Sequence, residues 1–170
     1  MTGFEAVAAA VATAACMTDV WSRRVPNLLT LPALAAGVLA HGLLPGGLGP
    51  LGALGGAAVG LAVFFPFFAL GGMGAGDVKL MAALGAWIGV PAIVWTALYC
   101  AVAGGVLGLA VALAHGYLIR ALVNIWHLMT FWRAHGVRPL PALTLEHGRG
   151  PRLPYAVPVL AGLVMALWRQ

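Results

Sequence analysis

Two aspartates, Asp19 and Asp77, are the residues of this sequence best placed for acid–base chemistry. The chain has four acidic residues among 170, and Asp77 stands where a glycine-rich segment, residues 72–76, meets an apolar run. A charged side chain at the centre of a membrane helix costs roughly 2.5 to 3.5 kcal/mol on insertion scales, so an acid at the edge of hydrocarbon is a functional candidate. Asp77 is therefore the residue that most needs an explanation.

The glycines before Asp77 sharpen this interpretation. Gly74 and Gly76 have no side chains, so a substrate backbone could come close to them, and positive φ angles would be permitted there. Such a loop suits the binding of an extended peptide. We expect Gly74 and Gly76 to resist replacement, and we expect Gly71, further from Asp77, to tolerate alanine better.

Asp19 ends the first apolar run, on the same predicted side of the membrane as Asp77. Two aspartates at one depth could share a proton, so that one activates water while the other protonates the carbonyl oxygen. The alternative is a surface salt bridge between Asp19 and Arg23, which are four residues apart on a helix. The spacing by itself favours neither interpretation.

Composition determines the class of protein that must hold these residues. The chain is 62% hydrophobic and 8% charged, with a mean hydropathy of +1.00, whereas a soluble domain is roughly 25% charged. We therefore predict an all-α integral membrane protein with a single polytopic domain over residues 1–170. A β-barrel would instead show alternating apolar and polar strands.

The apolar runs predict about six transmembrane helices, since one span needs about 20 residues. Their predicted ranges are 4–20, 27–44, 51–70, 78–90, 92–118 and 153–169. The run 78–90 covers only ~20 Å as a helix. Either it continues through Pro91, or it begins below the membrane surface and the glycine loop dips inward beside protein. Glycines four residues apart (Gly52, Gly56 and Gly60, with Gly104 and Gly108) indicate close helix packing.

Basic residues predict the orientation. Arg23, Arg24 and Lys79 lie in connections on one side, together with a later group in the fifth connection (Arg120, Arg133, Arg138, Arg149 and Arg152). The positive-inside rule then places the N-terminus outside and both aspartates at the cytoplasmic face. Residues 117–133 form a basic amphipathic pattern, which predicts a helix that extends the fifth span or lies on the anionic leaflet. The net charge of +5 is explained by this topology, and we expect no nucleic-acid partner.

The sequence indicates neither a metal nor a cofactor. Its five histidines show no ligand spacing and its two cysteines form no CxxC pair. The glycines complete neither G-x-G-x-x-G nor a phosphate-binding G-K-[ST] element. We therefore expect chemistry that uses protein side chains and water.

Three segments together carry a family resemblance. They are Gly74-Ala75-Gly76-Asp77, the Asp-x-x-x-Arg-x-x-Pro-Asn segment from Asp19 to Asn27, and Leu153-Pro154-Tyr155-Ala156-Val157-Pro158. This combination resembles the bacterial prepilin peptidases, the GxGD-type intramembrane aspartic proteases. The resemblance implies Asp19 and Asp77 as catalytic residues, and it implies substrate-binding roles for five others (Gly74, Gly76, Lys79, Pro26 and Asn27).

The resemblance also implies a reaction and a place. The substrate would be a type IV prepilin or similar precursor, cut after a glycine that ends a short basic leader, at the cytoplasmic face of the inner membrane. Larger members carry a CxxC-containing insertion and also methylate the product, but residues 21–26 hold no such insertion. We therefore expect a peptidase without methyltransferase activity, similar to the peptidases of Flp-type pili. Membrane lipids are the other expected partner, and the oligomeric state stays open.

Two other functions remain as alternatives. A small transporter or proton-conducting subunit could use Asp19 and Asp77 as a relay beside a cavity. A relay needs carboxylates spread across the membrane, however, and these two share one predicted face. A non-catalytic assembly scaffold would tolerate the replacement of both aspartates.

Overall fold

The computed structural model describes residues 2–140 and 154–169, and this part of the chain contains helices and no strand. The helices are α1 (Gly3–Ser22), α2 (Asn27–Leu43), α3 (Gly49–Ala69), α4 (Ala75–Ala114), α5 (Leu118–His135) and α6 (Ala156–Trp168). The predicted all-α class is thus confirmed. Several residues used above lie outside the described residues (Arg149, Arg152 and Leu153).

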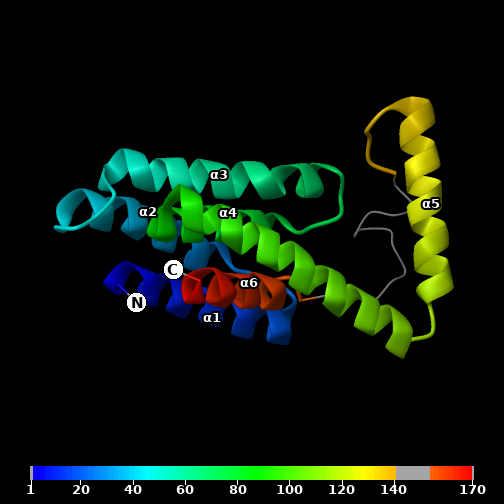
Figure 1. Ribbon diagram of the computed structural model, residues 1–170, viewed down its shortest axis with the longest axis horizontal. Helices are drawn as coiled ribbons and strands as arrows, with labels where there is room; N and C mark the ends of the chain where they lie inside the picture. Colours follow the sequence, from blue (N-terminus) through cyan, green and yellow to red (C-terminus); the bar gives the residue numbers. More distant parts are fainter. Residues whose placement is uncertain (1, 141–153, 170) are drawn as a thin grey trace.

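Five of the helices lie alongside one another as a bundle, and α5 stands across one end of it, beyond the end of α4 (Figure 1). Among the described residues, α1, α3 and α4 are long and apolar enough to cross a membrane, while α2 and α6 are shorter apolar helices. The predicted amphipathic helix is α5, which has no buried residue. The architecture is that of a helical membrane protein.

The helix α4 is two helices that fold back on each other at Gly89. Gly89 has φ 75° and ψ 178°, a conformation essentially restricted to glycine. A methyl group on Gly60 of α3 would meet both the carbonyl oxygen of Met81 and, at 3.2 Å, Cγ1 of Ile93. In a straight helix Met81 and Ile93 would be roughly 18 Å apart along the axis. The chain therefore reverses between them, as Figure 1 also shows.

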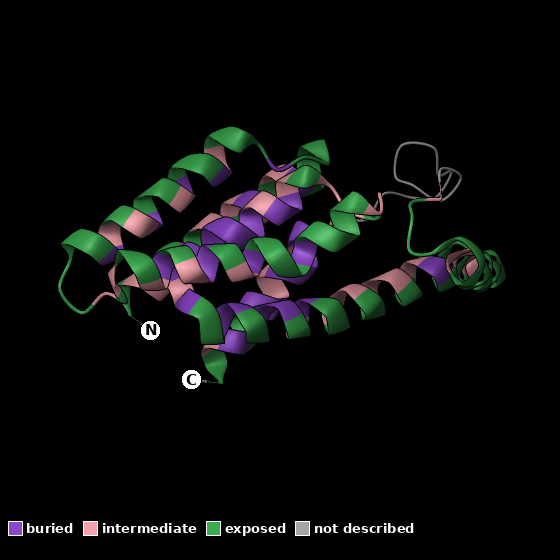
Figure 2. Ribbon diagram, turned by 90° about the horizontal axis from the view of Figure 1, so that it is seen from above, coloured by how far each residue is buried: buried purple, intermediate pink, exposed green. Residues whose placement is uncertain are grey.

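This reversal decides between the two predictions for the segment 78–90. The helix does not continue straight through Pro91, and its first part lies in the centre of the bundle, where most of its residues are buried (Figure 2). Gly60 of α3 lies against Met81 of α4. Beyond this contact α3 continues to Ala69, which is a longer stretch of helix than the part of α4 between Met81 and Asp77. At 1.5 Å per residue, Asp77 lies roughly 7 Å short of the end of α3. The glycine loop therefore dips inward beside protein.

The predicted glycine packing is confirmed where α3 meets the first part of α4. A methyl group on Gly56 would overlap the carbonyl oxygen of Gly85, and one on Gly85 would overlap that of Gly56. Gly60 meets the carbonyl oxygen of Met81 in the same way. Gly52 is different, because a methyl group there would contact only the side chain of Leu48. The close approach of the two backbones sets the depth of Asp77.

A buried histidine joins the helices at the end of the bundle remote from Asp77. His41 Nδ1 accepts a hydrogen bond from the Leu48 N–H (3.1 Å), so its Nε2 carries the proton and donates to the Trp87 carbonyl (3.0 Å). Trp87 Nε1–H donates in turn to the Ala33 carbonyl at 2.8 Å. The His41 ring also stacks on Phe4, with centroids 4.0 Å apart. These bonds make His41 a structural residue.

Candidate active site

Asp19 lies in the last turn of α1, and α6 holds its carboxylate. The C-cap residue of α1 is Arg23, which has φ 54° and donates its backbone N–H to the Asp19 carbonyl oxygen (2.8 Å). The side-chain Oδ2 of Asp19 accepts a hydrogen bond from the backbone N–H of Ala156 at 3.1 Å. Ala156 is the first residue of α6, and the N-terminus of a helix attracts a carboxylate. Asp19 is buried, with 6% of its surface exposed.

Asp77 lies in the first turn of α4 and is 8% exposed. Its carboxylate accepts a hydrogen bond from the backbone of Gly74, which is the N-cap residue of α4. An acid at the third helical position commonly makes this bond. The glycine loop and the start of the helix together fix the orientation of the carboxylate.

The structure brings Asp19 and Asp77 together. They come from separate helices, α1 and α4, and their carboxylates are close enough to interact electrostatically. Each also has a backbone N–H as a fixed hydrogen-bond donor. The two acids therefore lie in one protected site.

The glycine loop differs from the sequence prediction in its backbone angles. The positive φ belongs to Gly71, at 75°, directly before the glycine-rich segment, whereas Gly74 has φ −77° and Gly76 is helical. The prediction that Gly71 would accept alanine more readily is therefore wrong, because a side chain is strained at that φ. Gly76 needs to be glycine for a different reason. A methyl group there would lie 2.9 Å from the carbonyl oxygen of Val25.

Lys79 and Asn27, both predicted to bind substrate, contact each other. Lys79 Nζ donates a hydrogen bond to Asn27 Oδ1 at 2.9 Å, on an exposed part of the surface. Pro26 is the N-cap of α2, and its carbonyl accepts bonds from Leu29 and Thr30. The Lys79–Asn27 bond ties the start of α4 to the start of α2, close to Gly76 and Val25. Substrate binding by Lys79, Asn27 and Pro26 stays a prediction.

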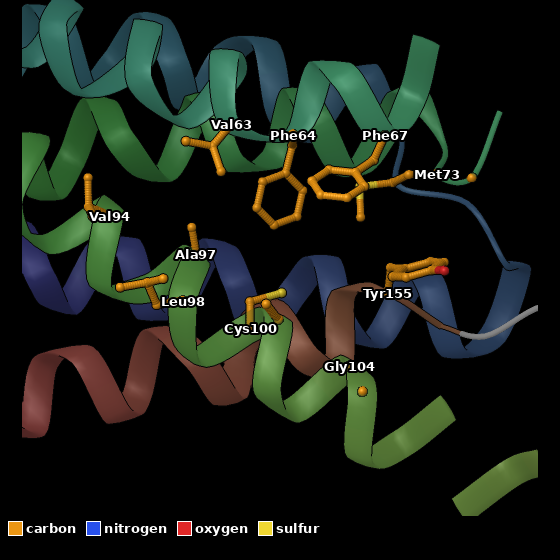
Figure 3. A pocket seen from close by; sticks show the side chains of 13 residues that line it. Val63, Phe64, Phe67, Met73, Val94, Ala97, Leu98, Cys100, Gly104 and Tyr155 are labelled. Atoms are coloured by element: carbon orange, nitrogen blue, oxygen red, sulfur yellow. The ribbon is translucent and has the colours of Figure 1, made fainter. Parts of the chain in front are cut away.

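An apolar cavity of ≈ 480 Å³, whose wall residues are drawn in Figure 3, lies close to Asp77. Its walls come from α3, the glycine loop, the second part of α4 and the residue before α6; they include Phe64, Phe67, Met73, Cys100, Gly104 and Tyr155. Tyr155 and Cys100 both interact electrostatically with Asp77. Two wall residues of the cavity are therefore neighbours of Asp77.

Sequence reasoning missed three residues of this site: Cys100, Tyr155 and Ala156. The signal for the last two was the Pro-Tyr-Ala segment at 154–156, which carried only the family resemblance. Cys100 had no signal of its own, because its position depends on the reversal at Gly89. In the described part of the chain, no group of three or more His, Cys, Asp or Glu side chains is arranged to hold a metal ion.

Two curated relatives, both named prepilin leader peptidase/N-methyltransferase, come from Aeromonas salmonicida, one of them from strain A449. Each is 36% identical over 99 residues, which cover 55% of this chain and 34% of the relative. The match thus spans about a third of the relatives' length. No solved structure matches this chain.

The family model described as the type IV leader peptidase family matches residues 6–109. This range contains both aspartates, the glycine loop and the reversal at Gly89. It covers more than half of the 170 residues. The chain therefore belongs to the type IV leader peptidase family.

Proposed function

We propose that this protein is an aspartic endopeptidase that removes the short basic leader from type IV prepilins of the Flp-like kind, after a glycine. The observation that carries the proposal is the buried pair of carboxylates, Asp19 and Asp77, on two helices of a chain of this family. Burial of an acid in an apolar protein is costly, so a buried acid is a functional candidate. Two of them in one site are suited to peptide hydrolysis.

The geometry supports a shared-proton mechanism. The ionised carboxylate takes a proton from water, whose oxygen attacks the carbonyl carbon of the scissile bond, while the protonated carboxyl gives its proton to the carbonyl oxygen. The tetrahedral intermediate then collapses, the C–N bond breaks, and a proton passes to the leaving amine. The backbone donors at Ala156 and Gly74 hold the two carboxylates in place throughout, which reduces the cost of reorganisation.

The same end of the bundle carries positive charge. Arg23 and Arg24 follow α1 directly, and Lys79 lies one turn after the start of α4. Basic residues of short connections mark the cytoplasmic side. We therefore place the carboxylate pair at the cytoplasmic face of the inner membrane, with the N-terminus of the chain outside.

We propose a peptidase without methyl transfer. The relatives carry an N-methyltransferase name, whereas the connection between α1 and α2 in this chain is residues 23–26 and contains no cysteine. Incubation with precursor and S-adenosylmethionine should give a trimmed product whose mass contains no added methyl group. A methylated product would contradict this part of the proposal.

The decisive experiment uses the purified full chain in liposomes and a synthetic precursor. The precursor has a basic leader, a glycine at the junction and an apolar segment after it. Mass spectrometry should find a single cut after the glycine. An intact precursor, together with a proton flux into the liposomes, would support the relay alternative instead. Against that alternative, both carboxylates lie at one end of the bundle and not across it.

The rate of cleavage should depend on pH in a bell-shaped manner. Low pH protonates both carboxylates and removes the base, while high pH removes the shared proton and so the acid. Other titratable groups near the pair are Cys16, Cys100 and Tyr155. Replacement of Cys16 by alanine should leave both limbs of the profile in place. A flat profile from acid to alkaline pH, with the chemical step shown to be rate-limiting, would argue against a shared proton.

Replacement of Gly76 by alanine should slow cleavage about tenfold or more. The added methyl group would press on the Val25 carbonyl, so the first turn of α4 must shift and carry Asp77 with it; small displacements of catalytic groups can cost about a hundredfold. Gly42→Ala in α2 is the matched control, because a methyl group there would make only ordinary contacts of 3.9–4.0 Å with the Pro50 side chain and Gly42 does not line the cavity. Both rates should be divided by the amount of folded protein. Equal rates for the two variants would show that the contact with Val25 is unimportant.

A further inference from the structure

The apolar cavity beside the carboxylate pair is a binding site in its own right. We propose that it receives the large apolar side chains that directly follow the cleaved bond of the precursor, and that its size determines which residues are accepted there. This inference rests on the proposed peptidase function. It adds a specificity site that involves residues of α3 and of the second part of α4.

The position of the cavity relative to the aspartates supports the assignment. Met73 in its wall directly precedes Gly74, whose backbone holds Asp77. Tyr155, another wall residue, directly precedes Ala156, whose N–H holds Asp19. A peptide carbonyl between the carboxylates would therefore have this cavity next to it. Adjacent residues of an extended chain lie about 3.3 Å apart, so the side chains nearest the bond can reach it.

The apolar walls favour the part of the precursor that follows the cleaved bond. The labelled side chains in Figure 3 are aliphatic, aromatic or sulfur-containing, with the Tyr155 hydroxyl as the polar exception. A lysine or arginine of the leader would lose its hydration there without gaining a partner. The apolar side chains after the bond have no such hydration to lose when they enter the cavity. A volume of ≈ 480 Å³ lies within the range of about 300–1,000 Å³ that is usual for binding pockets.

The cavity is also open toward the outside of the bundle. Phe67 on α3 and Leu98 on α4 line it, and they are 56% and 52% exposed. An apolar helix that lies in the membrane could therefore place its first residues in the cavity while its remainder packs along α3 and α4. A lipid acyl chain is the competing occupant, and the experiment below separates the two.

Gly105 offers a way to fill the cavity without disturbing the fold. It lines the cavity, and a Cβ built on it would meet no atom within 4 Å. Gly105→Trp should therefore occupy space that the substrate needs. The matched control is Val106→Trp, because Val106 is the next residue on the same helix, is 63% exposed, and lies outside the cavity wall.

The readout is kcat/KM for two synthetic precursors that differ after the cleaved bond. One carries leucine and phenylalanine at the first three positions, and the other carries alanine there. Gly105→Trp should lower kcat/KM about tenfold or more for the bulky precursor and much less for the alanine precursor, since pocket contacts discriminate by about 10–200-fold. Val106→Trp should leave the ratio of the two values as in the unmodified protein.

A general folding defect would not change this ratio, because a damaged protein would lose activity on both precursors alike. If Gly105→Trp lowers both values equally, or neither, the cavity does not hold these side chains, and occupation by lipid becomes the better interpretation. In that case the peptidase function still stands, provided that the unmodified protein cleaves. If the unmodified protein cleaves neither precursor, both the function and the specificity site are refuted.

Discussion

Asp19→Asn and Asp77→Asn should each lower the cleavage rate at least about a hundredfold, while the protein still inserts and folds. Asparagine keeps the size of the side chain and can still accept the backbone hydrogen bond from Ala156 or Gly74. It has no titratable proton, however, and general acid–base catalysis contributes about 10²–10⁴-fold to rates. Because the two carboxylates act as a unit, the double variant should be little worse than either single one.

The measurement is the initial rate on the synthetic precursor under saturating conditions, normalised to folded protein. Glu5→Gln is the matched control. It makes the same acid-to-amide change at the start of α1, and glutamine can replace glutamate in the capping box that Glu5 forms with Thr2. Near-normal cleavage by Asp19→Asn would refute the paired mechanism, even if Asp77 proved essential.

The second large effect is expected on folding, at the crossing of α3 and α4. Gly85→Ala adds a methyl group where the carbonyl oxygen of Gly56 lies against the helix. Both partners are backbone, so no side chain can rotate away and the helices must separate. Overpacking of this kind costs about 1–3 kcal/mol or more. Folded protein in the membrane should decrease strongly, and the temperature of unfolding in detergent should fall.

Gly55→Ala is the control for this effect. It lies next to Gly56 on α3, and a methyl group there would make an ordinary 3.5 Å contact with Val90 Cγ2. Both variants gain similar helix propensity, so a difference between them reports the crossing alone. Equal unfolding temperatures would mean that the two helices can move apart at little cost. Any Gly85→Ala protein that does fold should also cleave more slowly, because the crossing sets the depth of Asp77.

Composition and spacing were enough to predict the class of protein, the number of apolar segments and the two aspartates as candidate catalytic residues. Six predicted spans correspond to α1, α2, α3, the two parts of α4, and α6. Such predictions succeed because a span requires a long apolar run, which is a local property of the chain. Asp19 and Asp77 stood out because an acid within apolar surroundings is rare and costly.

How these parts meet depends on the packing of the helices, which local sequence does not reveal. Whether the segment 78–90 continued through Pro91 or began below the membrane surface stayed open until the contacts of Gly60 with Met81 and Ile93 revealed the reversal at Gly89. The partner of Asp19 is Ala156, 137 residues away. The cavity needs walls from three separate parts of the chain. Local patterns carry no information about such pairings, because each depends on which backbones can approach closely once the helices have packed. The glycines were visible in the sequence, but only packing decided which ones meet another backbone and which one needs a positive φ.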